Sequence, residues 1–226
     1  MGRPREHDER TRERLLESAA AIIDDEGGHE LTVRRLAEAA GVTTRAIYSL
    51  FGGMPGVLQE LFRLGAEDMA ARHEAVPRQE DAAQEIWPLA LAYRAGALAR
   101  PESFQLSYGR TGLQFPAPDE VVAQLWRCYE RVFDAVRRGL DQRGLVDRDP
   151  HQITAGLWAT VHGHASLELL GMLGPRAAAE LVWRGTIESL VAATFPGPPV
   201  PVSRRASSPA PSRRRPASGP RAGRRG

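Results

Sequence analysis

Apolar residues recur every three or four positions along most of the chain, a spacing typical of one face of an α-helix. The first such series, with Leu15, Ala19 and Ile22 on one face, runs up to the pair Gly27-Gly28, where a helix is expected to end. No stretch alternates between apolar and polar residues as a half-buried strand does. The pattern predicts an all-α protein. Further helices are expected after Thr32, after Thr43, and over about 55–73, 81–100, 102–108, 118–143, 150–173 and 175–195.

Residues 31–51 read LTVRRLAEAAGVTTRAIYSLF and combine two short helices with a sharp turn. Thr32 and Thr43 stand where each helix would begin, and a threonine side chain can cap the first backbone N–H groups. Gly41 stands between the helices, where the chain is expected to turn with a positive φ that glycine tolerates best. This spacing predicts a helix-turn-helix whose second helix would lie in the major groove of DNA.

This segment resembles the DNA-binding region of the TetR family of bacterial transcriptional regulators. The resemblance is close over about residues 10–60 and rests on Gly28, Leu31-Thr32-Val33, Leu36-Ala37, Ala40-Gly41-Val42, Ile47-Tyr48 and Phe51. It implies an N-terminal three-helix domain that binds DNA, followed by a helical bundle. The bundle would dimerise through its last two helices and bind a small molecule, which releases operator DNA.

A looser resemblance extends into the second half of the chain. Trp158, His162 and Gly163 lie in GLWATVHGHASLELL and are similar to the Trp-His-Gly signature of one C-terminal subtype of the family. Tyr93 and the run RPE at residues 100–102 also resemble this subtype.

Two positions depart from the family pattern. The family usually has a lysine that meets phosphate where this chain has Met54, followed by Pro55, and it often has His or Tyr where this chain has Leu50. Two polar DNA contacts are therefore expected to be missing, although the start of the fourth helix could still offer backbone N–H groups to a phosphate.

The residues expected to contact DNA lie in the two helices of the motif and at their starts. The candidates for base edges are Arg34, Thr44 and Arg45, since arginine suits guanine and threonine can contact either polar base edges or the thymine methyl group. The candidates for phosphates, which position a protein without reading sequence, are Thr32, Thr43 and Tyr48. Alternatives stay open: the two threonines can serve as helix caps alone, and Tyr48 can pack in the core with its hydroxyl at the rim.

Large aromatic side chains concentrate in the second half of the chain, where they could form a core or line a ligand pocket. Such pockets are mostly apolar with few polar groups. The candidates for ligand binding are Trp126, Tyr129, Trp158, His162, Phe104 and Tyr108. For each of them plain packing is the alternative, and for His162 it is a bond to a backbone carbonyl. The unknown effector is expected to be largely apolar or aromatic.

The composition excludes several classes of enzyme. The chain has no lysine, so all 30 basic residues are arginine, and a Walker A loop or a pyridoxal site is ruled out. The single cysteine, Cys128, cannot form an internal disulfide and fits a reducing compartment. It is expected to be either an oxidant sensor beside Arg127 or a buried inert thiol. No metal-ligand spacing or nucleophile elbow is visible, so we expect a protein that is not an enzyme and needs no metal or cofactor.

The net charge of +2 averages two different parts of the chain. Residues 1–195 hold 22 arginines and 28 acids, a net charge of −6, whereas residues 196–226 hold eight arginines and no acid. The second part is rich in Pro, Ser and Gly and is expected to be disordered, either adding phosphate contacts or having no role. The expected domains are 1–55 for DNA binding, 56–195 for effector binding and dimerisation, and 196–226 as a tail.

No apolar run is long enough to span a membrane, and the charged N-terminus is unlike a signal peptide, so we expect a cytoplasmic protein without a membrane partner. The sequence as a whole predicts a homodimeric transcriptional regulator, a repressor that binds a double-stranded palindromic operator. Two alternatives stay open. One is an architectural DNA-binding protein without an effector, and the other is a helical small-molecule-binding protein whose N-terminal helices are structural.

Overall fold

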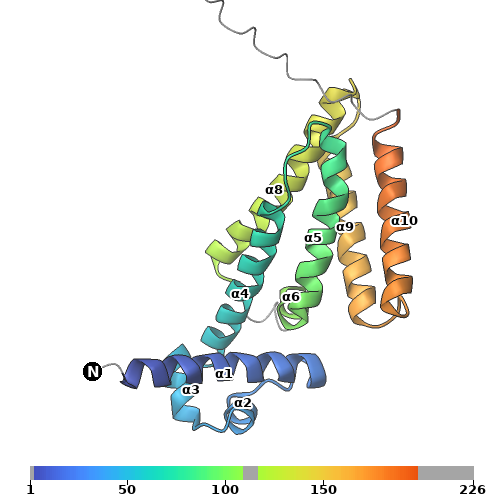
Figure 1. Ribbon diagram of the computed structural model, residues 1–226. Coiled ribbons are helices and arrows are strands. Elements are labelled where there is room, and N and C mark those ends of the chain that lie inside the picture. The colour runs from blue at the N-terminus through green and yellow to red at the C-terminus, as the bar shows by residue number, and fades with distance from the viewer. Residues whose placement is uncertain (1–2, 109–116, 198–226) are drawn as a thin grey trace, which may run out of the picture.

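The computed structural model describes residues 3–108 and 117–197, and every regular element in these residues is helical (Figure 1). The prediction of an all-α protein is confirmed for this part of the chain. The α-helices are α1 (Arg3–Glu26), α2 (Val33–Ala39), α3 (Thr44–Phe51), α4 (Met54–Glu74), α5 (Ile86–Ala99), α6 (Pro101–Tyr108), α8 (Asp119–Gln142), α9 (Pro150–Leu169) and α10 (Arg176–Thr194), and a 3₁₀-helix, η1, spans Ala82–Glu85.

Helices α1, α2 and α3 form a small N-terminal layer below the bundle in Figure 1, in which α1 lies between the bundle and the other two helices. Helix α4 runs from this layer into the bundle (Figure 1). The core of the layer contains Leu15 of α1, Leu36 of α2 and Ile47 of α3, all fully buried. The first turns of α4 complete this core with Val57 and Leu58. The chain therefore passes the domain boundary expected after residue 55 inside one continuous helix.

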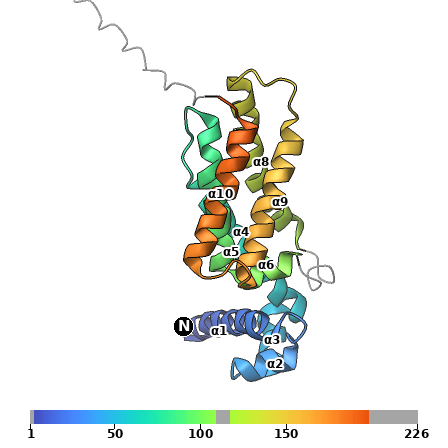
Figure 2. The same ribbon diagram turned by 90° about the vertical axis from the view of Figure 1, so that its right-hand side faces the viewer.

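The bundle consists of α4, α5, α8, α9 and α10, with α9 and α10 side by side on one outer face (Figure 2). Two apolar clusters fill it, and the largest fully buried side chain is Trp183 of α10. A buried ion pair joins three helices here, because Glu168 of α9 accepts two hydrogen bonds from Arg94 of α5, at 2.8 and 2.6 Å, and a third from the Trp183 indole at 2.8 Å.

Two predicted helices differ from the observed ones. The helix expected over 81–100 is divided into η1 and α5, because Asp81 caps a tighter turn by accepting a hydrogen bond from Ala83 N at 3.1 Å. The helix expected over 150–173 ends at Leu169, since Gly171 takes a φ of +71° that stops a right-handed helix.

Candidate functional site

The turn between α2 and α3 has the predicted geometry. Thr32 is the N-cap of α2, and its hydroxyl oxygen accepts a hydrogen bond from Arg35 N at 3.2 Å. Gly41 has a φ of +61°, as expected from its place between the helices. Ala37 and Ala40 are buried beside Leu36, so the two helices pack closely. A helix-turn-helix is therefore present in residues 32–51.

Thr43 does not cap α3 as the sequence predicted. Its backbone is extended and stands at the N-cap position, but its side chain makes no capping hydrogen bond. The start of α3 is held instead by the backbone, where Ala46 N donates to the Thr43 carbonyl at 3.0 Å. The Thr43 hydroxyl is exposed at a helix N-terminus, a position that suits an anion such as phosphate.

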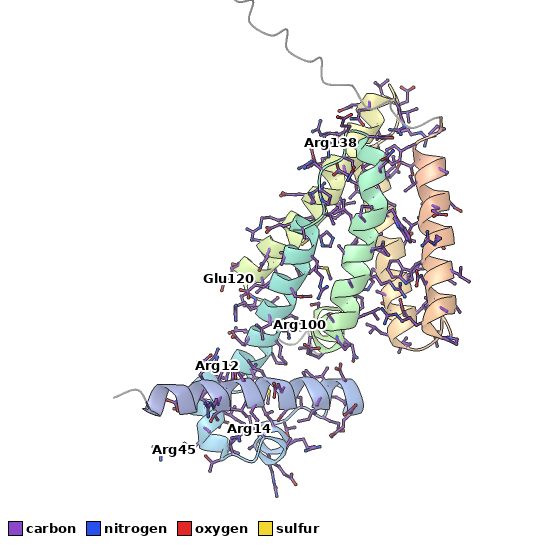
Figure 3. The ribbon with its side chains drawn as sticks, in the orientation of Figure 1. Arg12, Arg14, Arg45, Arg100, Glu120 and Arg138 are labelled. Carbon is purple, nitrogen blue, oxygen red and sulfur yellow. The ribbon has the colours of Figure 1, made fainter. Side chains whose placement is uncertain are left out.

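The six side chains predicted to contact DNA all lie exposed on this motif: Thr32, Arg34, Thr43, Thr44, Arg45 and Tyr48. Tyr48 is 58% exposed, so the alternative of a core tyrosine is wrong. In Figure 3, Arg45 lies at the foot of the molecule, on the far side of α1 from the bundle. Within the described part of the chain, neither Arg34 nor Arg45 has a carboxylate within ion-pair distance, so both guanidinium groups face solvent.

Two other arginines of this layer are engaged with the protein. Arg35 donates to Glu26 at 3.2 and 2.5 Å, and this contact lowers the pKa of the Glu26 carboxyl. Arg12 donates to the Leu50 carbonyl at 2.9 Å and stacks over the Phe51 ring at 4.4 Å. Through these two contacts, Arg12 of α1 binds the C-terminal end of α3.

The two departures from the family pattern are explained by packing. Met54 and Leu50 are both partly buried against the core of the N-terminal layer. Pro55 stands in the first turn of α4 and carries no N–H. The start of α4 thus offers one backbone donor fewer than an ordinary helix start.

An apolar cavity of about 110 Å³ lies in the bundle, between α4, α5, α6, α8 and α9. Of the ligand-binding candidates, Phe104, Tyr129 and Trp158 line it. His162 does not line it but supports its wall, since its ring stacks on Phe104 at 5.0 Å and its Nδ1 lies 3.1 Å from the Tyr93 hydroxyl. The side chain of Tyr108 lies outside the described residues.

Trp126 does not line the cavity and is 58% exposed. Leu125, Cys128, Tyr129 and Val132 face the cavity, at the spacing of one face of α8, and Trp126 lies about 100° away from Leu125 around that helix. The same spacing, counted from Tyr129, could have identified these residues in the sequence.

Sequence reasoning also missed further polar side chains of the cavity, among them His73, Arg100, Ser103, Ser107 and Thr154. His73 is buried in the last turn of α4, where burial lowers its pKa and keeps the ring neutral near pH 7. Burial raises the pKa of Cys128 to about 11, so its thiol is protonated at neutral pH. This contradicts the oxidant-sensor interpretation of Cys128 and favours an inert thiol.

Among the residues that the structure describes, no three His, Cys, Asp or Glu side chains are grouped so that they could hold a metal ion. Within the same residues, no helix is long and apolar enough to cross a membrane.

Two family models match the chain, and together they span most of the described fold. Residues 15–61 match the model for bacterial regulatory proteins of the tetR family. Residues 88–190 match the model for the tetracyclin repressor-like C-terminal domain. The chain belongs to the TetR family. Accordingly, its N-terminal layer is a DNA-binding helix-turn-helix domain and its bundle is a ligand-binding domain of a transcriptional regulator.

Solved structures share this TetR-family fold. PfmR from Thermus thermophilus is 19% identical with a TM-score of 0.63, covering 80% of this chain and 95% of that one. The ketosteroid transcriptional regulator KstR2 of Mycobacterium tuberculosis is 18% identical with a TM-score of 0.66, covering 80% and 93%. FadR from Bacillus halodurans, a fatty acid degradation regulator, is 15% identical with a TM-score of 0.61, covering 80% and 94%. No curated protein matches the chain in sequence.

Proposed function

We propose that the chain is a homodimeric repressor that binds a palindromic operator and is released from it by a small molecule, acting in the cytoplasm. The observation that carries the proposal is the pairing of two features in one chain: a helix-turn-helix with exposed arginines, and a cavity in the bundle above it. The domains would be 1–55 for DNA binding and 56–195 for effector binding and dimerisation. The assignment of the second domain to the Trp-His-Gly subtype belongs to the same proposal.

The proposed DNA contacts follow from exposure and charge. Arg34, Thr44 and Arg45 would meet base edges, because their side chains are exposed on α2 and at the start of α3, which would enter the major groove. The remaining candidates, Thr32, Thr43 and Tyr48, would meet phosphates.

Two helices connect the cavity with the DNA-binding layer. The first turns of α4 belong to the core of the layer, and residues further along α4 line the cavity. On α6, Ser103 lines the cavity and donates to the Leu61 carbonyl of α4 at 2.9 Å, while Leu106 packs in the core of the layer. A ligand that shifts α4 or α6 would therefore move α3, and the separation of the two reading helices in the dimer would change.

The experiment that tests this function begins with the full chain and a random double-stranded DNA library, from which the preferred site is selected. We expect a palindrome whose half-site centres lie about 34–36 Å apart or a multiple of that distance. Arg45→Ala should weaken binding by about 1–3 kcal/mol and relax the preference at one base pair of each half-site. Arg35→Ala is the matched control, because that arginine pairs with Glu26, and it should leave the preferred sequence unchanged.

Three results would contradict the proposal in different ways. If Arg45→Ala lowered the affinity equally for all DNA sequences, Arg45 would contact a phosphate and not a base. Tight binding without any preferred sequence would favour an architectural DNA-binding protein. No DNA binding at all would favour a helical small-molecule-binding protein.

A further inference from the structure

The lining of the cavity is mostly apolar and carries one formal charge. Of the described residues that line it, none is an aspartate or glutamate, and the single arginine is Arg100. His73 also lines the cavity, but burial lowers its pKa, so its ring adds no second positive charge near pH 7. An apolar site with one cation favours a ligand that brings one negative charge, because a ligand cation would find no counter-ion among these residues.

Arg100 is held more loosely than the other arginines that pair with buried carboxylates. Its Nη1 lies 3.6 Å from the Glu102 carboxylate, and within the described part of the chain its guanidinium makes no hydrogen bond. By contrast, Arg94 donates to Glu168 at 2.8 and 2.6 Å, and Arg143 donates to Asp81 at 2.9 and 2.8 Å. The side chain of Arg100 is 38% exposed. Its N–H donors can therefore turn to a ligand in the cavity.

The partner of Arg100 is a buried carboxylate at the border of the DNA-binding layer. Glu102 is 4% exposed and lies on α6, which packs against α1. Figure 3 shows Arg100 at the end of the bundle that faces α1. Ser103 Oγ lies 3.2 Å from the Glu102 carboxylate and 2.9 Å from the Leu61 carbonyl, and its one hydrogen can serve only one of them. Among the described residues, Arg100 thus supplies the positive charge that Glu102 needs.

The side of α1 that meets Glu102 carries further negative charge. Partial burial, the Glu102 carboxylate and Asp25 raise the pKa of Asp24 to about 6, so Asp24 is ionised at pH 7.5 and is repelled by Glu102. No arginine of the described residues lies within ion-pair distance of Asp24, and Arg35 of α2 pairs with Glu26 instead. The contact between α1 and α6 therefore depends on the charge of Arg100.

We infer that the cavity takes a largely apolar molecule with one carboxylate, and that Arg100 both binds this carboxylate and carries the effect of binding to α1. A ligand that draws the guanidinium away from Glu102 leaves the Glu102 and Asp24 carboxylates to repel each other, which loosens α6 from the DNA-binding layer. The inference rests on the proposed function only in naming this molecule as the effector that releases the operator.

The ligand class is tested with three probes that share one apolar scaffold and differ in charge: 4-phenylbutanoate, 4-phenylbutan-1-ol and 4-phenylbutan-1-amine. Binding to the full chain is measured by isothermal titration calorimetry at pH 7.5. We expect the carboxylate to bind at least about fivefold tighter than the alcohol, and the amine to bind most weakly, because a hydrogen bond to a charged group is the stronger one. Equal binding of carboxylate and alcohol would overturn the inference, and so would the absence of binding by all three.

The variant Arg100→Met tests whether Arg100 is the cause of this preference. It should bind the carboxylate no tighter than the alcohol, whereas Arg100→Lys should keep part of the preference because it keeps the charge. Arg137→Met is the matched control, since Arg137 is exposed on α8 and does not line the cavity. The double variant Arg100→Met/Glu102→Gln leaves no uncompensated carboxylate and serves if Arg100→Met does not fold. A preference for the carboxylate that survives in either folded variant would overturn the inference.

The path to α1 is tested with the selected operator. At equal occupancy of the cavity, 4-phenylbutanoate should weaken operator binding at least about fivefold more than the alcohol does. Asp24→Asn should reduce this difference, because it removes the group that Glu102 repels. Equal effects of the two probes, or a difference that Asp24→Asn leaves unchanged, would overturn the role of Arg100 in reaching α1. If the probes rank as expected but no DNA sequence is preferred, the proposed function fails and the ligand class stands.

Discussion

Among the residues that the structure describes, carboxylates with little or no exposure pair with arginine side chains. Glu85 is fully buried and accepts hydrogen bonds from Arg131 at 2.5 Å and Arg138 at 2.7 Å. Glu168 accepts from Arg94 and Trp183. All basic residues of this chain are arginine, since it has no lysine. Arginine suits such sites because its planar guanidinium can donate two parallel hydrogen bonds to one carboxylate.

Glu168→Ala should destabilise the protein by about 3–5 kcal/mol, because it leaves Arg94 as an unpaired buried charge and the Trp183 indole without its acceptor. Urea unfolding followed by circular dichroism measures the loss. Glu188→Ala is the matched control on an exposed pair with Arg184, and it should cost less than about 1 kcal/mol. Similar losses for both variants would contradict the structural role of the buried pair.

Asp24 should make stability depend on pH. It lies in the last turn of α1, where partial burial, the Glu102 carboxylate and Asp25 raise its pKa to about 6. A carboxyl whose pKa is raised by folding favours the folded state below its ordinary pKa of 3.8, and this advantage is lost as the pH rises through about 6.

Asp24→Asn should therefore raise the melting temperature above pH 6 and flatten its fall between about pH 4 and 6. Melting curves across this range measure the effect, with Asp8→Asn on the exposed part of α1 as the control. Parallel pH profiles of Asp24→Asn and the unchanged protein would show that Asp24 titrates as an ordinary surface carboxyl.

Among the elements, the junction of α3 and α4 is the tightest connection in the DNA-binding layer. Gly52 ends α3 with a φ of +71°, and α4 starts two residues later. At Gly56 a Cβ atom would lie 1.8 Å from the Phe51 carbonyl oxygen, which belongs to the backbone. The angle between α3 and α4 therefore depends on the absence of a side chain at this position.

Gly56→Ala should destabilise the protein by at least about 2 kcal/mol, since the clash is with backbone and α4 must shift. Denaturant unfolding measures this loss of stability. Operator binding by the same variant should also weaken, because α3 moves with α4. Gly156→Ala on α9 is the control, as its added Cβ would meet nothing within 4 Å. It should be neutral or stabilising by up to about 1 kcal/mol. Unchanged stability of Gly56→Ala would show that the junction adapts at no cost.

For the whole molecule, the outer face of α9 and α10 is the surface expected to form the dimer (Figure 2). Large apolar side chains are exposed there or at the turn between the two helices, among them Leu170, Met172 and Leu181, each at least 70% exposed. Cβ atoms added at Gly163 and Gly185 would meet nothing within 4 Å, so a second copy could approach the backbone closely. We expect the four helices of two chains to bury this face.

Leu181→Glu should convert the dimer into a monomer, because it would place a charge without a partner inside the interface. Analytical ultracentrifugation at micromolar concentration measures the state, and circular dichroism should stay unchanged because Leu181 is 71% exposed in the single chain. Val146→Glu, at a valine in the turn before α9 that is 84% exposed, should leave the dimer intact. A monomeric unchanged protein would contradict the predicted dimer itself.

The helix-turn-helix could be predicted from the sequence because the interactions that form it are local. Thr32 caps a helix that starts one residue later, and Gly41 turns the chain within a few residues of both helices. Apolar spacing likewise predicted most helices of the bundle, since the period of 3.6 residues is a property of each segment alone. The exposed candidates on α2 and α3 follow from the same local pattern.

Only the tertiary structure decided which side chains meet each other. Arg35 pairs with Glu26 of another helix, Trp126 lies outside the cavity while Leu125 lines it, and His73 is buried beside it. These outcomes depend on how helices far apart in the chain pack together, and a single sequence contains no signal for that geometry. The cavity is lined by residues from five helices, so its lining became visible only when those helices were assembled.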